Sequence, residues 1–201
     1  MTIYELKPKF QNLLRPLTKK LFEANITANQ VTVFACAVSV VVGIILVKFA
    51  YIPALFFILP VWLFVRMALN AIDGMLAREF NQKSTLGGYL NEVTDVISDS
   101  ALYLPFAFIA PFDWTIIMAI VFLSQLSEFL GVLGQAICKT RRYDGPMGKS
   151  DRAFAFGLLG TIYACFGELA SWVYYVGVLI AVMLVITCIN RVKMGLKETN
   201  L

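Results

Sequence analysis

Apolar runs long enough to cross a lipid bilayer follow one another through most of this chain, with short polar connections between them. Of the 201 residues, 59% are apolar and only 15% are charged, and the mean hydropathy is +0.76. Soluble domains usually have roughly a quarter of their residues charged. Runs of this length predict an integral membrane protein rather than a large soluble core.

The apolar runs predict an all-α integral membrane fold with six transmembrane helices. We place these helices at residues 31–50, 52–77, 86–110, 112–138, 153–170 and 172–192. The second to fourth exceed the ~20 residues that a bilayer requires, so their cytoplasmic ends are expected to project into water. The run 153–170 is the weakest, since three glycines and Glu168 interrupt it.

The positions of lysine and arginine predict the orientation. Five basic residues precede the first run, two lie in 78–85, five lie in 139–152 and three lie at the end of the last run or after it, whereas the opposite side carries only Lys48. The positive-inside rule then places both termini and the loop 139–152 in the cytoplasm, which we take to be that of a bacterial cell with the protein in its inner membrane. Because topology accounts for the net charge of +4, the charge does not indicate a nucleic-acid partner.

Residues 1–24 are predicted to form a separate juxtamembrane element, and residues 25–201 the six-helix membrane domain. Apolar residues recur at spacings of three and four between Lys and Arg, which is typical of an amphipathic helix on the surface of a lipid bilayer. The apolar positions are Ile3, Leu6, Phe10, Leu13, Leu14, Leu17 and Leu21. Pro8 and Pro16 are expected to break or kink this helix.

The composition excludes several kinds of site. The chain has no histidine, and its four cysteines are far apart with no CxxC pair. Histidine catalysis, histidine-ligated metals, zinc sites and disulfide frameworks are therefore not expected.

Polar residues form two stripes near the cytoplasmic ends of the second and third predicted helices. Residues three or four apart share a helix face, and charges at membrane depth usually face an interior cavity or a partner. The two stripes consist of Arg66, Asn70, Asp73 and Ala77, and of Gly87, Asn91, Asp95 and Asp99. We expect them to face each other and to form an oxygen-rich pocket suited to Mg²⁺, Mn²⁺ or Ca²⁺. Arg78 either extends to the membrane surface or binds phosphate beside that pocket.

The stretch from Asn70 to Asp95 resembles the signature of the CDP-alcohol phosphotransferase (CDP-alcohol phosphatidyltransferase) family. That signature is D-x2-D-G-x2-A-R-x8-G-x3-D-x3-D, and the chain reads N-x2-D-G-x2-A-R-x8-G-x3-N-x3-D with every spacing kept. The residues that match are Asp73, Gly74, Ala77, Arg78, Gly87 and Asp95, while Asn70 and Asn91 replace the first and third aspartates. The stretch TANQVT at 27–32 is similar to the family's usual entry to its first span.

This resemblance implies a transferase of phospholipid biosynthesis that works at the cytoplasmic face, as a homodimer. An alcohol or alcohol phosphate would attack the β-phosphorus of a CDP-linked lipid donor, usually CDP-diacylglycerol, and CMP would leave. By resemblance, Mg²⁺ or Mn²⁺ would lie at the four ligand positions Asp73, Asp95, Asn70 and Asn91, and Asp95 would be the catalytic base. Arg78 would contact the donor phosphates, and Gly74, Ala77 and Gly87 would make room for the nucleotide.

The two asparagines lower the negative charge of the predicted metal site. Asparagine offers a carbonyl ligand without charge, so the four ligand positions carry two negative charges instead of four. We therefore expect at most one tightly bound cation without donor, and a second that arrives with the donor. Glu92 projects about 100° from Asn91 on a helix and is not expected to be a ligand; Asp99 lies on the correct face but deeper.

Basic residues beyond the signature offer an acceptor site. In GKSDR, Lys149 and Arg152 are candidates for binding an alcohol phosphate, although topology alone also explains basic residues in this loop. Arg66 and Glu128, both at membrane depth, form either a structural ion pair or part of the site.

Two other classes remain open from the sequence. The spacing N-x3-D-x3-D from Asn91 to Asp99 resembles the first motif of UbiA-type prenyltransferases, but no second Asp-rich motif follows and DGxxAR is left unexplained. A catalytically decayed scaffold or transporter would explain the missing carboxylates.

Overall fold

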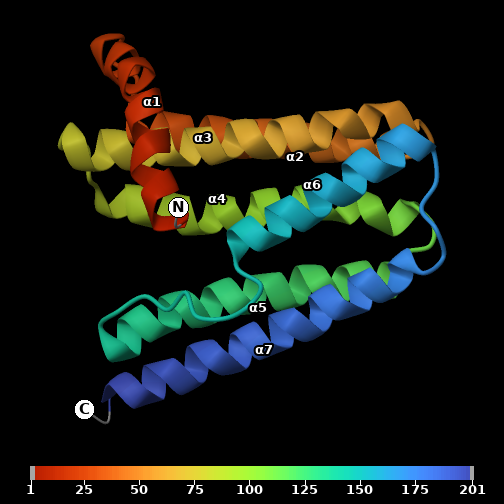
Figure 1. The fold of residues 1–201 in the computed structure, drawn as a ribbon. Helices are drawn as coiled ribbons and strands as arrows, with labels where there is room; N and C mark the ends of the chain where they lie inside the picture. Colours follow the sequence, from red (N-terminus) through yellow and green to blue (C-terminus); the bar gives the residue numbers. More distant parts are fainter. Residues whose placement is uncertain (1–2, 200–201) are drawn as a thin grey trace. The chain divides into compact units, whose positions relative to one another are not determined.

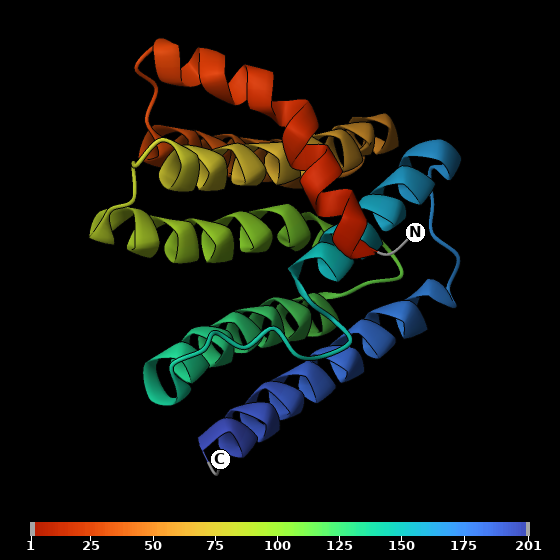
Figure 2. The same cartoon turned by 60° about the vertical axis from the view of Figure 1, so that its left-hand side comes forward.

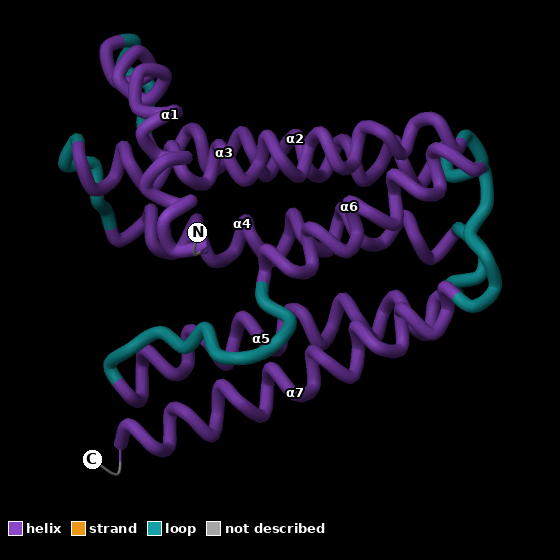
Figure 3. The backbone as a smooth tube through the Cα atoms, in the orientation of Figure 1, coloured by secondary structure: helices purple, strands orange, loops and turns teal. Residues whose placement is uncertain are grey.

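The computed structural model describes residues 3–199, and every regular element in that part of the chain is a helix (Figures 1 and 3). The side chains of residues 3–9 and 199 lie outside the described part, so the predicted apolar positions Ile3 and Leu6 stay predictions. The elements are α1 (Ile3–Glu23), α2 (Ala28–Lys48), the 3-10 helix η1 (Pro53–Phe57), α3 (Ile58–Glu79), α4 (Thr85–Tyr103), the 3-10 helix η2 (Leu104–Phe108), α5 (Trp114–Cys138), α6 (Lys149–Phe166) and α7 (Val173–Thr199).

Four stretches are long and apolar enough to cross a membrane: Ala28–Lys48, Pro53–Glu79, Trp114–Cys138 and Val173–Glu198. Their length and composition establish an integral membrane protein. Helices α4 and α6 coincide with the two remaining predicted spans, but each carries three charged residues and is not among these four stretches. The count of six spans therefore stays a prediction.

The ends of α4 and α6 differ from the prediction. The span expected at 86–110 ends as an α-helix at Tyr103, and the 3-10 helix η2 follows with Pro105, which lacks an N–H for the α-helical hydrogen-bond ladder. The run expected at 153–170 begins earlier, at Lys149, because the Asp151 carboxylate accepts the backbone N–H of Gly148 at 2.9 Å and caps the helix. It also ends earlier, at Phe166.

Two compact units divide the chain. The first comprises Met1–Val41 and Val61–Ser98, and the second comprises Val42–Pro60 and Asp99–Leu201.

In the first unit, α1 packs on α3. Arg15 forms an ion pair with Glu79 at 3.0 Å, and the rings of Phe22 and Phe80 lie 4.5 Å apart. The helix runs through Pro8 and Pro16 without a break, and Figure 2 shows it bending along its course, in line with the kink that was expected as the alternative to a break. Leu13 remains 75% exposed, which leaves an apolar residue for the predicted contact with lipid.

The core of the first unit lies where α2 meets α3. Ala28, Val31, Ile72 and Leu76 are buried together. This small core fixes the start of α2 against the C-terminal half of α3, and both segments carry residues of the site described below.

Aromatic side chains form the core of the second unit. Phe56 packs edge-to-face on Phe106 and Tyr163, and the rings of Tyr103 and Phe156 stack at 4.1 Å. The Tyr163 hydroxyl donates to the carbonyl of Ala50 at 2.9 Å, so its polar end is satisfied. These contacts connect η1, η2 and α6.

Candidate active site

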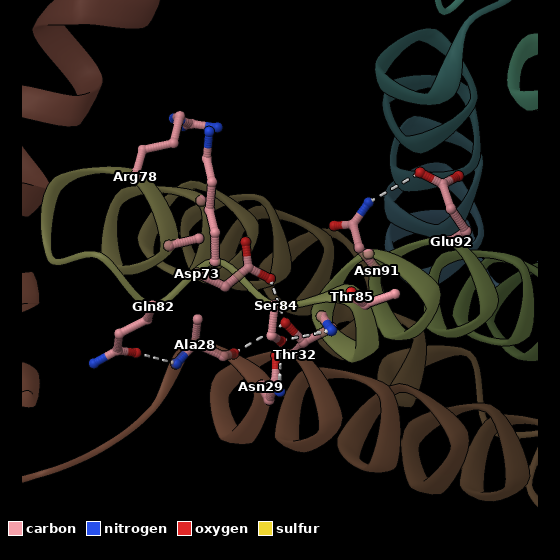
Figure 4. Close-up of a pocket in the computed structure, with 15 residues that line it drawn as sticks. Ala28, Asn29, Thr32, Asp73, Arg78, Gln82, Ser84, Thr85, Asn91 and Glu92 are labelled. Carbon is pink, nitrogen blue, oxygen red and sulfur yellow. Dashed lines mark hydrogen bonds between the residues drawn. The ribbon is translucent and has the colours of Figure 1, made fainter. Parts of the chain in front are cut away.

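A cavity of about 580 Å³ opens within the first unit, between the start of α2, the C-terminal half of α3, the turn 80–84 and the start of α4 (Figure 4). Six of the predicted site residues line it: Asp73, Gly74, Ala77, Arg78, Gly87 and Asn91. The spacing of these six signature residues thus corresponds to one pocket, to which α2 and the turn 80–84 also contribute.

Asp73 is the buried acid of this pocket. Asp73 is only 6% exposed, and the hydroxyl of Thr32, on α2, lies 2.8 Å from the Oδ2 atom of Asp73 (Figure 4). A hydroxyl donor to a carboxylate fixes its orientation and offsets part of its desolvation. Thr32 thereby positions Asp73 from a different helix. The sequence had pointed to TANQVT only as an entry to a span, not as a support for this carboxylate.

The start of α2 is tied to the turn that follows α3. The backbone N–H of Ala28 donates to Oε1 of Gln82 at 2.7 Å, and the Asn29 amide donates to the Ser84 hydroxyl at 3.5 Å. All four residues line the cavity. Sequence reasoning missed Asn29, Gln82 and Ser84, because their partners are 54 and 55 residues away in the chain.

Gly74 and Gly87 allow polar groups to approach the helix backbones. A Cβ atom at Gly74 would lie 2.9 Å from Nη2 of Arg78, so the guanidinium lies back over the helix at this point. A Cβ atom at Gly87 would lie 2.8 Å from Oδ1 of Asn29. Both contacts are closer than a carbon atom tolerates, so larger residues would displace polar groups of the pocket.

The predicted ligand positions separate into two groups. Asp73 and Asn91 line the cavity, whereas Asn70 and Asp95 are not among its lining residues. Instead, Asn70 Nδ2 lies 3.5 Å from Oδ1 of Asp95, and Nη2 of Arg66 lies 3.1 Å from the same oxygen. The sequence left open an ion pair between Arg66 and Glu128; the structure pairs Arg66 with Asp95.

Glu92 lines the cavity as well, although its angle of about 100° from Asn91 did not favour it as a ligand. Its Oε1 atom accepts the Asn91 amide at 3.4 Å (Figure 4). The helical angle between adjacent residues was right, but the pocket is wide enough to include both. Glu92 thus restores a carboxylate beside one of the two asparagines.

The donor set fits a single hard cation held together with a phosphate ligand. The cavity offers the carboxylates of Asp73 and Glu92 and the amide of Asn91, all oxygen ligands. In the described part of the chain, no group of three or more His, Cys, Asp or Glu side chains is placed to hold a metal ion. Mg²⁺ in proteins is commonly bound by one or two carboxylates and completed by substrate phosphates and water.

An ionic cluster lies in the second unit. Arg152 is fully buried and contacts Asp99 at 2.9 Å and Glu128 at 3.1 Å. Glu128 also contacts Arg141 at 3.4 Å and Arg191 at 3.6 Å. The cluster therefore places three guanidinium groups around two carboxylates. The buried Nε atoms of Arg152 and Arg191 have no hydrogen-bond partner, and Lys149 begins the same helix as Arg152.

A comparison with protein families decides the membership of this chain. The sequence profile of the CDP-alcohol phosphatidyltransferases matches residues 25–190. The chain belongs to this family. The resemblance inferred from the signature is thus confirmed, and the UbiA-type alternative loses its support.

Relatives within the CDP-alcohol phosphatidyltransferase family include proteins with and without an assigned reaction. The chain is similar to the inner membrane protein YnbA of Escherichia coli K12, at 47% identity over 96% of each chain. It is also similar to the phosphatidylinositol phosphate synthase of Mycobacteroides abscessus, at 26% identity over 86% of this chain and 81% of the relative.

Solved structures share the fold. The phosphatidylinositol phosphate synthase PgsA1 of Mycobacterium tuberculosis, in complex with manganese and citrate, superimposes with a TM-score of 0.73 at 21% identity, over 90% of this chain and 87% of that one. The same synthase with CDP-DAG bound gives 0.73 over 90% and 92%. At this identity the likeness shows the fold.

Proposed function

We propose that the protein transfers a phosphatidyl or other substituted phosphoryl group from a CDP-linked lipid donor, CDP-diacylglycerol foremost, to an alcohol. The observation that carries the proposal is the pocket of the first unit, in which the signature residues Asp73 and Arg78 line one cavity with an oxygen-only ligand set. The family match and the CDP-DAG complex of a structural relative support the donor.

The reaction exchanges one phosphoryl bond. The alcohol oxygen forms a bond to the β-phosphorus of the donor, the bond from that phosphorus to the CMP oxygen breaks, and the alcohol proton passes to a base. Asp95 is the proposed base, and Asp73 with Asn91 would hold the divalent cation, Mg²⁺ or Mn²⁺. When bound, the cation offsets negative charge on the pyrophosphate and on the leaving CMP.

Arg78 is the proposed contact to the donor phosphates. It lines the cavity beside Gly74, and its planar guanidinium suits two phosphate oxygens at once. Gly74, Ala77 and Gly87 keep the walls of the cavity free of bulky side chains, which leaves space for a nucleotide.

An anionic acceptor, such as an alcohol phosphate, is proposed for the region of Lys149 and Arg152. The support is the excess of positive charge in the second unit, where three arginines surround Asp99 and Glu128. Buried Nε donors of Arg152 and Arg191 without partners favour an added oxygen ligand. A neutral small alcohol has no negative charge that could pair with these arginines.

The site is proposed to face the cytoplasm of a bacterial inner membrane, and the protein to form a homodimer as the family resemblance implies. The inner-membrane relative supports the location. The dimer is tested by light scattering of the purified protein in detergent, where the mass of the protein part should be twice that of one 22.4 kDa chain.

The function is tested by CMP release from CDP-diacylglycerol in nanodiscs with Mg²⁺, using a panel of alcohols and alcohol phosphates. Wild type should release CMP with at least one acceptor, and Asp73→Ala should abolish both CMP release and Mg²⁺-dependent binding of the donor. Glu23→Gln is the matched control, because Glu23 is an exposed acid paired only loosely with Lys19 at 3.8 Å.

The alternative outcomes separate the remaining hypotheses. Donor binding without CMP release, across the whole panel, would favour the decayed scaffold that the two asparagines suggest. Undiminished Mg²⁺-dependent binding by Asp73→Ala would remove Asp73 from the metal site.

A further inference from the structure

Arg66 places a permanent positive charge against Asp95. The residue is only 4% exposed, and its Nη2 atom lies 3.1 Å from Oδ1 and 3.3 Å from the backbone carbonyl of Asp95. A guanidinium group stays protonated in proteins, and a buried one requires a compensating anion. Asp95 supplies that anion from the neighbouring helix.

Asn70 complements this ion pair. It lies one helical turn after Arg66 on α3, and its amide nitrogen lies 3.5 Å from the same Oδ1 atom. An aspartate at this position has no hydrogen to donate to Asp95 and would repel it at this distance. The asparagine is thus matched to the arginine, since both side chains donate to one carboxylate oxygen.

The charges of the site then suit one divalent cation rather than two. Among the four signature ligand positions only Asp73 and Asp95 are charged, and Arg66 offsets the charge of Asp95. Glu92 adds one carboxylate beside Asn91, so the cavity itself carries the two negative charges of Asp73 and Glu92, which match one divalent cation. A second divalent cation beside Asp95 would also face the fixed charge of Arg66 across a few ångströms in a poorly screened environment. Asp73, with its Thr32 support, remains for the first cation.

We propose that Arg66 takes the place of a second metal ion, so that the enzyme binds a single divalent cation both without and with its CDP-linked donor. This inference rests on the proposed function. It differs from the expectation drawn from the two asparagines alone. In that expectation a second cation arrives with the donor. Arg66 is a positioning residue. It holds the Asp95 carboxylate in place, as a second metal ion would otherwise do, and leaves the single cation on the Asp73 side.

The experiment counts Mn²⁺ ions bound per chain, by electron paramagnetic resonance and equilibrium dialysis, in zwitterionic nanodiscs with and without CDP-diacylglycerol. Wild type should bind one ion under both conditions, with an uncoupled spectrum. In the double variant Arg66→Met/Asn70→Asp, the donor should bring in a second ion, visible as a spin-coupled pair. Arg66→Lys keeps the charge and should stay at one ion.

Arg15→Met is the matched control, because it also removes an arginine from an ion pair of the first unit, with Glu79, outside the pocket lining. It should stay at one ion. A coupled pair in wild type would overturn the proposal and leave the proposed function intact. No bound ion in wild type, with or without donor, would overturn the metal site and the proposed function together. If the double variant does not fold, the wild-type count decides; if it folds and stays at one ion, Arg66 does not have this role.

Discussion

At the scale of single residues, the site depends on side chains that hold one another across helices. Asp73 is oriented by Thr32, Asp95 by Arg66 and Asn70, and Glu92 by Asn91. Local spacing predicted which residues of α3 and α4 belong together, because helix periodicity places them on one face. It could not predict Thr32 as a partner of Asp73, since that contact joins residues 41 positions apart.

Thr32→Val is expected to weaken cation binding while leaving the fold intact. The substitution keeps the shape of the side chain but removes the hydroxyl 2.8 Å from Asp73. Hydrogen bonds to charged groups contribute about 1.5–3 kcal/mol, so we expect roughly a tenfold or greater loss of Mn²⁺ affinity. Calorimetric titration measures it. Thr161→Val, which removes a hydroxyl bonded to a helix carbonyl in α6, should not change the affinity.

At the scale of elements, the pocket exists because the first turns of α2 and α4 approach each other closely at Gly87. The hydroxyl of Ser84 caps the start of α4 by accepting the N–H of Gly87 at 2.9 Å, and Asn29 reaches Ser84 from α2. The neighbouring position 88 does not require a glycine in this way, because a Cβ atom at Gly88 would meet nothing within 4 Å. The two adjacent glycines therefore provide an internal comparison.

Gly87→Ala is expected to disturb the pocket, and Gly88→Ala is not. The new methyl at position 87 would lie 2.8 Å from Asn29 and 3.0 Å from Ser84, so both polar groups must move. We expect a loss of about 1 kcal/mol in the free energy of unfolding and weaker donor binding. Gly88→Ala should be neutral or slightly stabilising, since alanine favours a helix. Equal behaviour of the two variants in thermal unfolding and donor binding would contradict this account.

At the scale of the whole molecule, the distribution of basic residues predicts which ends of the helices face the cytoplasm. Arg141, Arg142 and Lys149 lie in or beside the loop 139–152, and Lys48 ends α2 at the opposite side in the predicted topology. Arg142 is held to Asp144 and Glu198, and the first of these hydrogen bonds raises the pKa of its guanidinium, so its charge persists at any physiological pH. The charge of Arg142, one of those on which the predicted orientation rests, is thus permanent.

Cysteine accessibility checks this topology. In a background with the four native cysteines replaced, Ser150→Cys should react with a membrane-impermeant maleimide only after the cells are opened, whereas Lys48→Cys should react in intact cells. Ser150 is exposed in the structure, so a lack of labelling cannot come from burial in the protein. Labelling at position 150 from outside intact cells would reverse the predicted orientation.

The sequence by itself determined the helical membrane class, the approximate helix bounds and the six signature residues that line the pocket. These properties depend on hydropathy and on spacing within one helix, which are local and additive. Tertiary structure decided the partners: Arg66 pairs with Asp95, Arg152 joins Asp99 and Glu128, and Glu92 reaches the cavity. A long charged side chain can reach several neighbours, and only the packing of one helix against another determines which of them it meets.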